Sequence, residues 1–406
     1  MRVFSIVLLI LVGVVFVITP AGLLADLTHA TDSNALAQGL IENTDWLADA
    51  LGNPEWYYKM LDNVASFMAW IGVSLDKTVW VGIILVYYML ATVLPIDKLI
   101  GNLYPLFGFA LLFMAVGIFV VLIYGSITGT VTIPDGLTDG LHTRYKGDAA
   151  LTHPIFPMMF VSIACGAISG FHATQSPMMA RCLKNEKLAR PVFYGAMVTE
   201  GFVALIWAAG AIAFVGGYDA MSEYMKTNTP GSLVHDLSFD WLGTFGGLLA
   251  MIGVIAAPIS TGDTALRSAR LIVADFMKMS QKKFLSRLAI SIPIFAIVFA
   301  MMFIDFNVLW RYFAWSNQTL AVFTLWACTV YLARKKKFYY ITLLPAIFMT
   351  AVSVSYLMFS PRPEGLGINW GISVAAGVCV AISFTALFYN FLRKYNNNKI
   401  TRKFDY

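Results

Sequence analysis

Glu200 is the residue of this sequence that most needs a chemical explanation. It lies about two turns inside the apolar run 192–216. An ionised side chain at the centre of a bilayer costs roughly 2.5–3.5 kcal/mol. A carboxyl in such a place favours its protonated form and ionises when water reaches it, which is what proton coupling requires. We therefore interpret Glu200 as a proton-coupling candidate, with a neutral, hydrogen-bonded structural residue as the alternative.

A second titratable side chain, His172, follows the apolar run 154–170 within the sequence Gly-Phe-His-Ala-Thr-Gln-Ser-Pro. We expect the helix to break at this point and a short polar turn to follow. Histidine titrates near neutral pH, so His172 could share a proton with Glu200 or donate to a substrate carboxylate. The alternative is a histidine that caps the backbone. Gln175 and Ser176 are candidates for the substrate or ion path, or they cap the helix that follows.

The apolar run 242–260 ends in a group of hydroxyl and carboxyl side chains around Pro258 and Gly262. Proline removes a backbone donor and frees a carbonyl, which in a discontinuous helix could coordinate an ion or a substrate. The alternative is a simple N-cap for a basic helix that begins at Thr264. The side chains in question are Ser260, Thr261 and Asp263.

The run 308–333 opens with Leu-Trp-Arg-Tyr-Phe-Ala-Trp-Ser-Asn-Gln-Thr. Arg311 either attracts anions at an external entrance or extends its charged end to the membrane surface. Asn317 and Gln318 lie deeper and are candidates for contacts between helices or with a substrate.

Motifs typical of enzymes are absent from the sequence. It contains no GxGxxG, no phosphate-binding GxxxxGK[ST], no GxSxG and no HExxH. The four cysteines have no metal-ligand spacing, so neither a metal site nor a disulfide framework is expected. We therefore expect no catalysis and no cofactor.

The elements that must position these residues are membrane helices. The chain of 406 residues is 59% hydrophobic and 13% charged, with a mean hydropathy of +0.72, which is typical of repeated membrane spans. We predict an all-α polytopic membrane protein with about ten spans. The predicted spans are residues 3–25, 78–94, 103–124, 154–170, 192–216, 242–260, 288–306, 308–333, 338–359 and 367–392.

Lysine and arginine predict the orientation of these spans. If the N-terminus is cytoplasmic, 21 of the 28 basic residues fall on the inner side, in keeping with the positive-inside rule. The C-terminal tail, residues 393–406, is then cytoplasmic as well, and residues 26–77 form an external region. The basic residues do not gather into a patch with aromatic interleaving, so nucleic acid is not an expected partner.

Several stretches resemble the carbon starvation protein A family of bacterial inner-membrane transporters. They are GAISGFHATQSPMMARCLKNE, VFYGAMVTEGFVALIWA, APISTGDTALRSARLIVADF and RYFAWSNQTLAVFTLWA. The resemblance implies uptake of peptides or pyruvate coupled to protons. It also implies a fold related to the amino acid, polyamine and organocation transporters. It places near the translocation path His172, Gln175, Ser176, Glu200, Thr261, Asp263, Asn317 and Gln318.

The same resemblance predicts that the chain starts partway into the family's pattern, because members usually carry further helices ahead of the segment similar to Met1–Leu24. We therefore expect one transmembrane transporter domain, residues 1–406, in the bacterial inner membrane. Its expected partners are the lipid bilayer, a peptide or pyruvate and protons, and a homo-oligomer is compatible with the sequence. The alternatives are a nutrient sensor without net transport and an inactive, N-terminally truncated fragment.

Overall fold

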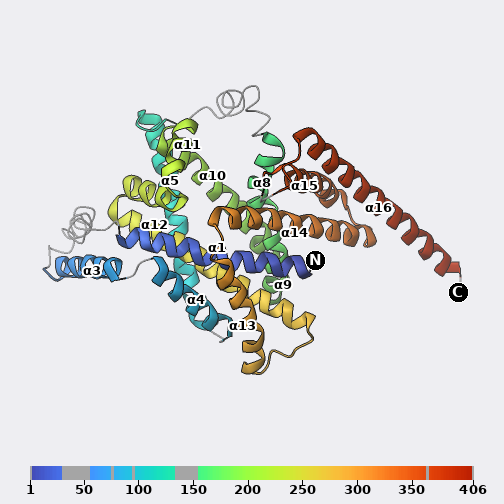
Figure 1. Ribbon diagram of the computed structural model, residues 1–406, viewed down its shortest axis with the longest axis horizontal. Helices are drawn as coiled ribbons and strands as arrows, with labels where there is room; N and C mark the ends of the chain where they lie inside the picture. Colours follow the sequence, from blue (N-terminus) through green and yellow to red (C-terminus); the bar gives the residue numbers. More distant parts are fainter. Residues whose placement is uncertain are drawn as a thin grey trace. The chain divides into compact units, whose positions relative to one another are not determined.

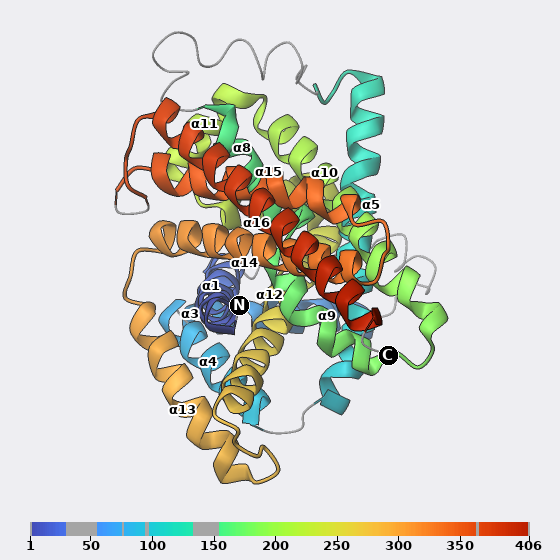
Figure 2. The same ribbon diagram turned by 90° about the vertical axis from the view of Figure 1, so that its right-hand side faces the viewer.

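The computed structural model describes residues 2–29, 55–74, 77–93, 97–132, 154–362 and 365–404. Every regular element in these ranges is a helix, and Figures 1 and 2 show the helices from two directions. The prediction of an all-α architecture is therefore confirmed for the described part of the chain. Of the predicted external region, residues 30–54, 75 and 76 lie outside the described residues, whereas α3 (Glu55–Ser74) lies within them.

Seven helices of the described part are long and apolar enough to cross a membrane. They are α1 (Arg2–His29), α5 (Asp97–Thr128), α10 (Ala196–Val215) with the turns before it, α12 (Pro230–Phe276), α13 (Phe284–Met301), α15 (Tyr340–Phe359) and α16 (Trp370–Phe404). Three further helices cover the remaining predicted runs: α4 (Lys77–Val93), α8 (Ile155–Ala167) and α14 (Phe306–Arg334). All ten predicted runs thus fall on helices, while the number that span the membrane stays a prediction.

The helices form two compact units. The first unit combines Met1–Leu11, Tyr145–Met197 and Phe303–Tyr406. In it α15 packs against both α14 and α16, and α14 also packs against α8 and α9 (Gly170–Cys182) (Figure 2). Its core is apolar and includes Val161, Val322, Met349, Val352 and Tyr356.

The second unit combines Val12–Arg144 and Val198–Met302. Its central element is α12, which packs against α4, α5 and α13. α11 (Tyr218–Thr227) belongs to the same unit. Apolar side chains from α5, α10 and α12 build one core cluster, which includes Met114, Ile118, Ala213, Leu237 and Ala250.

α12 contains a sharp turn at Gly243. A straight helix of its 47 residues would measure about 70 Å, and the hydrocarbon core of a bilayer is only about 30 Å thick. Gly243 has φ 68° and ψ 179°, a conformation that glycine adopts far more easily than other residues. The helix does not end with the predicted span 242–260 but continues to Phe276.

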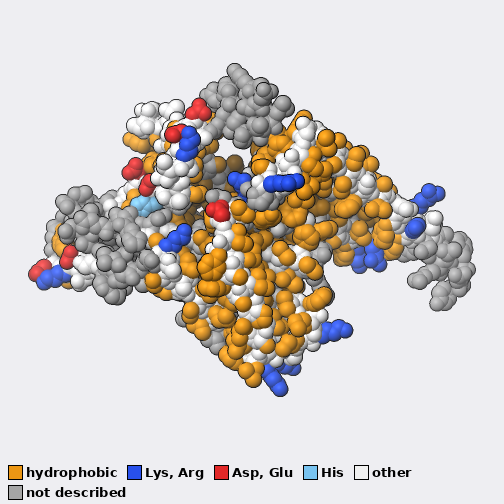
Figure 3. All heavy atoms as spheres, viewed as in Figure 1, with side chains coloured by type: hydrophobic (Ala, Val, Ile, Leu, Met, Phe, Trp, Pro, Cys, Tyr) orange, Lys and Arg blue, Asp and Glu red, His pale blue; other side chains and the backbone are white. Residues whose placement is uncertain are grey.

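The surface of the described part is largely apolar. Figure 3 shows hydrophobic side chains over most of the face drawn, with few charged side chains among them. Phe202 and Leu205 on α10 and Leu387 on α16 are each more than 60% exposed. Large apolar side chains in such numbers require a non-aqueous surrounding, which agrees with a membrane-embedded protein.

Candidate functional site

The first candidate site is the interruption between α8 and α9. α8 ends at Ala167, Ile168 leaves the helical conformation with φ −135° and ψ 63°, and α9 begins at Gly170. Each of the two helices has 13 residues, or about 20 Å, so neither crosses a bilayer alone. The predicted break after the run 154–170 is therefore confirmed.

The predicted polar turn after the break is wrong. Ser169 is the N-cap of α9, and its Oγ accepts a hydrogen bond from the Phe171 amide at 3.2 Å. Because this cap satisfies a backbone donor at Gly170–Phe171, the helix starts before His172. His172, Gln175 and Ser176 all lie within α9 and are partly buried. Ser176 therefore does not cap a later helix, and its hydroxyl donates to the His172 carbonyl at 2.6 Å.

Polar side chains of α14 hold this break in place. Asn317 Oδ1 accepts hydrogen bonds from Ser169 Oγ at 3.0 Å and from the Phe171 amide at 2.9 Å. Gln318 Nε2 donates to the Val161 carbonyl of α8. Asn317 and Gln318 are 1% and 0% exposed. The two adjacent residues therefore contact both halves of the interrupted helix, which is one of the two roles predicted for them.

Close backbone packing supports the same contact. A Cβ added to Gly170 would collide with the Asn317 carbonyl oxygen and lie 2.7 Å from Leu320 Cβ. Buried Gln318 Oε1 accepts no hydrogen bond within the described part of the chain. A polar atom without a partner in a buried site is a place where a bound ligand or water could donate. Arg311 lies nearer the start of α14 and is exposed.

The second candidate site is in the other unit, where Tyr88 of α4 meets α1 and α12. Tyr88 is fully buried, and its hydroxyl lies 2.7 Å from the Phe16 carbonyl oxygen and 3.2 Å from that of Pro258. Pro20 lies four residues after Phe16 and has no N–H, so it leaves the Phe16 carbonyl without its helical donor. The Tyr88 hydroxyl supplies that missing hydrogen bond.

The segment around Pro258 remains helical, and hydroxyl side chains add hydrogen bonds to its backbone. The hydroxyls of Ser260 and Thr261 both donate to the Ala257 carbonyl, at 2.8 and 2.9 Å. Neither the predicted discontinuity nor the predicted N-cap is present at this position. Ser260 and Thr261 are instead interior residues of α12.

A charged cluster follows one turn later on α12. Asp263 is 2% exposed and pairs with Arg267 at 3.2 Å. Arg267 Nη2 also donates to the Ala91 carbonyl, and Arg287 Nη1 donates to the Val93 carbonyl, at 3.0 and 3.1 Å. Both carbonyls belong to the last turn of α4, where cations are stabilised by the helix dipole.

Arg270 completes this cluster. It is 7% exposed, and its Nε and Nη1 find no acceptor within the described residues. The positive charges of Arg287 and Arg267 repel the positive charge of Arg270. Arg267 and Arg270 are both residues of α12, and their position on the cytoplasmic side stays a prediction.

Glu200 lies on the helix that covers the predicted span 192–216, but the described part of the chain does not enclose its side chain. It lies near the start of α10, and its side chain is exposed. It belongs to the second unit, whereas His172 belongs to the first. The exchange of a proton between them stays a prediction. No group of three or more His, Cys, Asp or Glu residues able to hold a metal ion occurs among the described residues.

Sequence reasoning missed Tyr88, Arg267 and Arg270 as site residues. A signal for the ion pair existed, since Asp263 and Arg267 are four residues apart and face each other on a helix. The role of Tyr88 had no local signal, because its two acceptors lie 72 and 170 residues away along the chain.

Comparison with known proteins identifies relatives of this chain. The family described as carbon starvation protein CstA matches residues 61–239 and 231–356. An uncharacterized membrane protein of Haemophilus influenzae is 41% identical over 235 residues, which cover 54% of this chain and 58% of that protein. The pyruvate/proton symporter BtsT of Escherichia coli is 40% identical over 93 residues, or 23% of this chain and 12% of the symporter.

The peptide transporter CstA of Escherichia coli is 34% identical over 146 residues, which cover 36% of this chain and 20% of the transporter. The chain thus spans less than two thirds of the length of each of these three relatives. No solved structure matches it.

Proposed function

The chain belongs to the carbon starvation protein CstA family, and from this premise we propose that it carries pyruvate or short peptides across the inner membrane together with protons. The relatives BtsT and CstA of Escherichia coli support the two substrate classes, since the first is named a pyruvate/proton symporter and the second a peptide transporter. Both substrates carry a carboxylate, so one kind of anion site would serve either.

The observation that carries the proposal is the interrupted helix α8–α9 and its contact with α14. In many membrane transporters the substrate binds where helices are interrupted, because free backbone groups and helix ends face it there. The N-terminus of α9 has a partial positive charge, which suits a carboxylate. Buried Asn317 and Gln318 contribute amide groups at the same place, and amides can bind both ends of a peptide bond.

For the coupled proton we propose Asp263 beside the earlier candidates Glu200 and His172. Asp263 is the buried one of these three, and it pairs with Arg267. Protonation of its carboxylate would remove the charge that holds Arg267, and such a change is what proton binding must cause in a coupled transporter.

Uptake into proteoliposomes tests the substrate part of the proposal. We expect labelled pyruvate or a labelled dipeptide to accumulate when a proton gradient is imposed. Asn317→Leu should reduce uptake at least tenfold, because it removes the acceptor for Ser169 and Phe171. Thr324→Val is the matched control on α14, since the Thr324 hydroxyl donates only to the Leu320 carbonyl of its own helix. Accumulation of neither substrate would contradict the proposal, and binding without counterflow would favour a sensor.

A gradient-dependence measurement tests the proton part. Asp263→Asn should retain substrate exchange without a gradient and lose gradient-driven accumulation. Glu200→Gln and His172→Gln are measured in the same way. A variant that accumulates substrate with unchanged dependence on the proton gradient excludes the substituted residue as the coupling group.

A further inference from the structure

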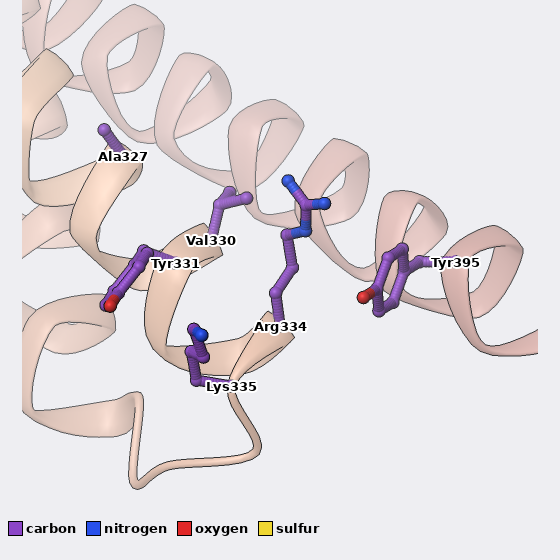
Figure 4. Close-up of a pocket in the computed structure, with 6 residues that line it drawn as sticks. All are labelled: Ala327, Val330, Tyr331, Arg334, Lys335 and Tyr395. Atoms are coloured by element: carbon purple, nitrogen blue, oxygen red, sulfur yellow. The ribbon is translucent and has the colours of Figure 1, made fainter. Parts of the chain in front are cut away.

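An open cavity of about 610 Å³ lies between the end of α14 and α16 in the first unit. Figure 4 shows Arg334 extending from the end of α14 toward α16, which carries Tyr395. The Arg334 guanidinium lies 5.3 Å from the centroid of the Tyr395 ring, within the range of a cation–π interaction. The lining residues are Ala327, Val330, Tyr331, Arg334, Lys335 and Tyr395.

Within the described residues, the two cations of this pocket have no carboxylate partner. None of the six lining residues is acidic, and neither Arg334 nor Lys335 forms an ion pair within the described part of the chain. The pocket therefore has a charge of +2 at one end, which favours an anion.

These cations are not needed to close the helix either. The last carbonyls of α14 accept backbone hydrogen bonds: Lys336 N donates to Ala333 O at 3.0 Å and Lys337 N donates to Leu332 O at 2.9 Å. Lys336 has φ 55°, so this is the left-handed C-terminal motif that satisfies a helix end without side chains. The side chains of Arg334 and Lys335 thus remain available for a ligand.

The opposite end of the pocket is apolar. Ala327 and Val330, which line it, lie one to two turns before Arg334 on α14. A small free anion would gain nothing from these apolar walls. A ligand with an anionic head and hydrocarbon chains would contact both ends, and such ligands surround every membrane protein.

We propose that this pocket binds the phosphate of an anionic phospholipid headgroup, with Arg334 and Lys335 contacting the phosphate oxygens and the acyl chains lying along Ala327 and Val330. Tyr395 holds the Arg334 guanidinium in position. A basic run that only orients the helix in the membrane would use its four cations equally. Arg334 and Lys335 line the pocket, whereas Lys336 and Lys337 do not, which separates the two explanations.

Native mass spectrometry of the purified full chain in detergent tests the proposal. The probes are phosphatidylglycerol, zwitterionic phosphatidylethanolamine and inorganic phosphate. We expect phosphatidylglycerol to bind at least tenfold more tightly than phosphatidylethanolamine, with inorganic phosphate displacing it only weakly. Equal affinity for the two lipids would overturn the proposal. Displacement by phosphate as effective as by the lipid would overturn the lipid as the source of the anion.

Matched charge variants make the test specific. Arg334→Gln/Lys335→Gln should lose at least tenfold in affinity for phosphatidylglycerol, whereas Lys336→Gln/Lys337→Gln, with the same change in net charge, should lose less than twofold. Equal losses in both variants would contradict a built site. Tyr395→Phe should retain binding, and Tyr395→Leu should weaken it because the ring is lost. The melting temperature without lipid shows that each variant is folded, and none of these results depends on the transported substrate.

Discussion

The Tyr88 side chain donates a hydrogen bond to a backbone carbonyl of another membrane helix, α1. Pro20 in α1 has no N–H to donate to the Phe16 carbonyl, and water is not available to replace that helical donor inside a bilayer. The Tyr88 hydroxyl, from another helix, makes this hydrogen bond at 2.7 Å. Gly262 makes room for the ring, because a Cβ there would collide with the Tyr88 side chain. The hydroxyl and the small residue are thus parts of one arrangement.

The contribution of this hydroxyl to stability can be tested by removing it. Tyr88→Phe should lower the free energy of unfolding by about 1–3 kcal/mol, because the buried hydroxyl and its hydrogen bond to the Phe16 carbonyl are lost while the packing of the ring is unchanged. Thermal unfolding of the purified protein in detergent measures the change. Tyr194→Phe, at an exposed position, is the control and should shift the melting temperature little. A melting temperature of Tyr88→Phe equal to that of the wild type would show that the bond contributes nothing.

At the scale of elements, the contact between α9 and α14 depends on the absence of a side chain at one position. Gly170 lies against the Asn317 carbonyl and Leu320 Cβ, and the hydrogen bonds from Ser169 and Phe171 to Asn317 form across the same contact. The interruption of the helix and its attachment to α14 are therefore one structural feature. Any change that separates the two helices also breaks those hydrogen bonds.

Two glycine-to-alanine substitutions, one at the contact and one away from it, test this feature. Gly170→Ala should destabilise the protein by about 1–3 kcal/mol, the usual effect of overpacking, and should lower substrate uptake, because α9 must move away from α14. Gly166→Ala in α8 is the matched control, since a Cβ there meets nothing within 4 Å. The measurements are thermal unfolding and proteoliposome uptake on the same preparations. If Gly170→Ala behaves like Gly166→Ala in both, the close approach is not needed.

At the scale of the whole molecule, the orientation in the membrane is a prediction from the charge distribution. The segment 181–190, from the last turn of α9 onward, carries Arg181, Lys184, Lys187 and Arg190 and is expected on the cytoplasmic side. Cys182 is exposed in this segment. The same charge distribution predicts that residues 217–241, between the predicted spans 192–216 and 242–260, are external. α11 lies in this stretch, and Ser222 is exposed on it.

Cysteine labelling measures this orientation. A variant whose only cysteine is Cys182 should react with a membrane-impermeant maleimide only after the cells are permeabilised. A variant with Ser222→Cys as its only cysteine should react in intact cells. The reverse pattern would mean that the predicted orientation is inverted, and labelling of both in intact cells would contradict the predicted span between them.

Hydrophobic runs and turn-forming residues are local properties, so they predicted the helical class, the positions of ten helical runs and a break at the end of the run 154–170. The sequence also showed the resemblance to the CstA family, because Asn317, Gln318 and their neighbours form a contiguous motif. The sequence did not predict that α12 continues through Pro258, since proline disfavours a helix interior and the contact of Tyr88 with the Pro258 carbonyl comes from another helix.

Composition by itself determined that this chain forms membrane helices, because nothing else buries so much apolar surface while satisfying the backbone within each segment. Only the tertiary structure decided which polar groups meet. Asp263 is enclosed and Glu200 is exposed, although Glu200 has the more apolar sequence around it. The physical reason is that burial of a side chain in a helical membrane protein depends on which face of the helix contacts its neighbours, and hydropathy along one helix does not contain that information.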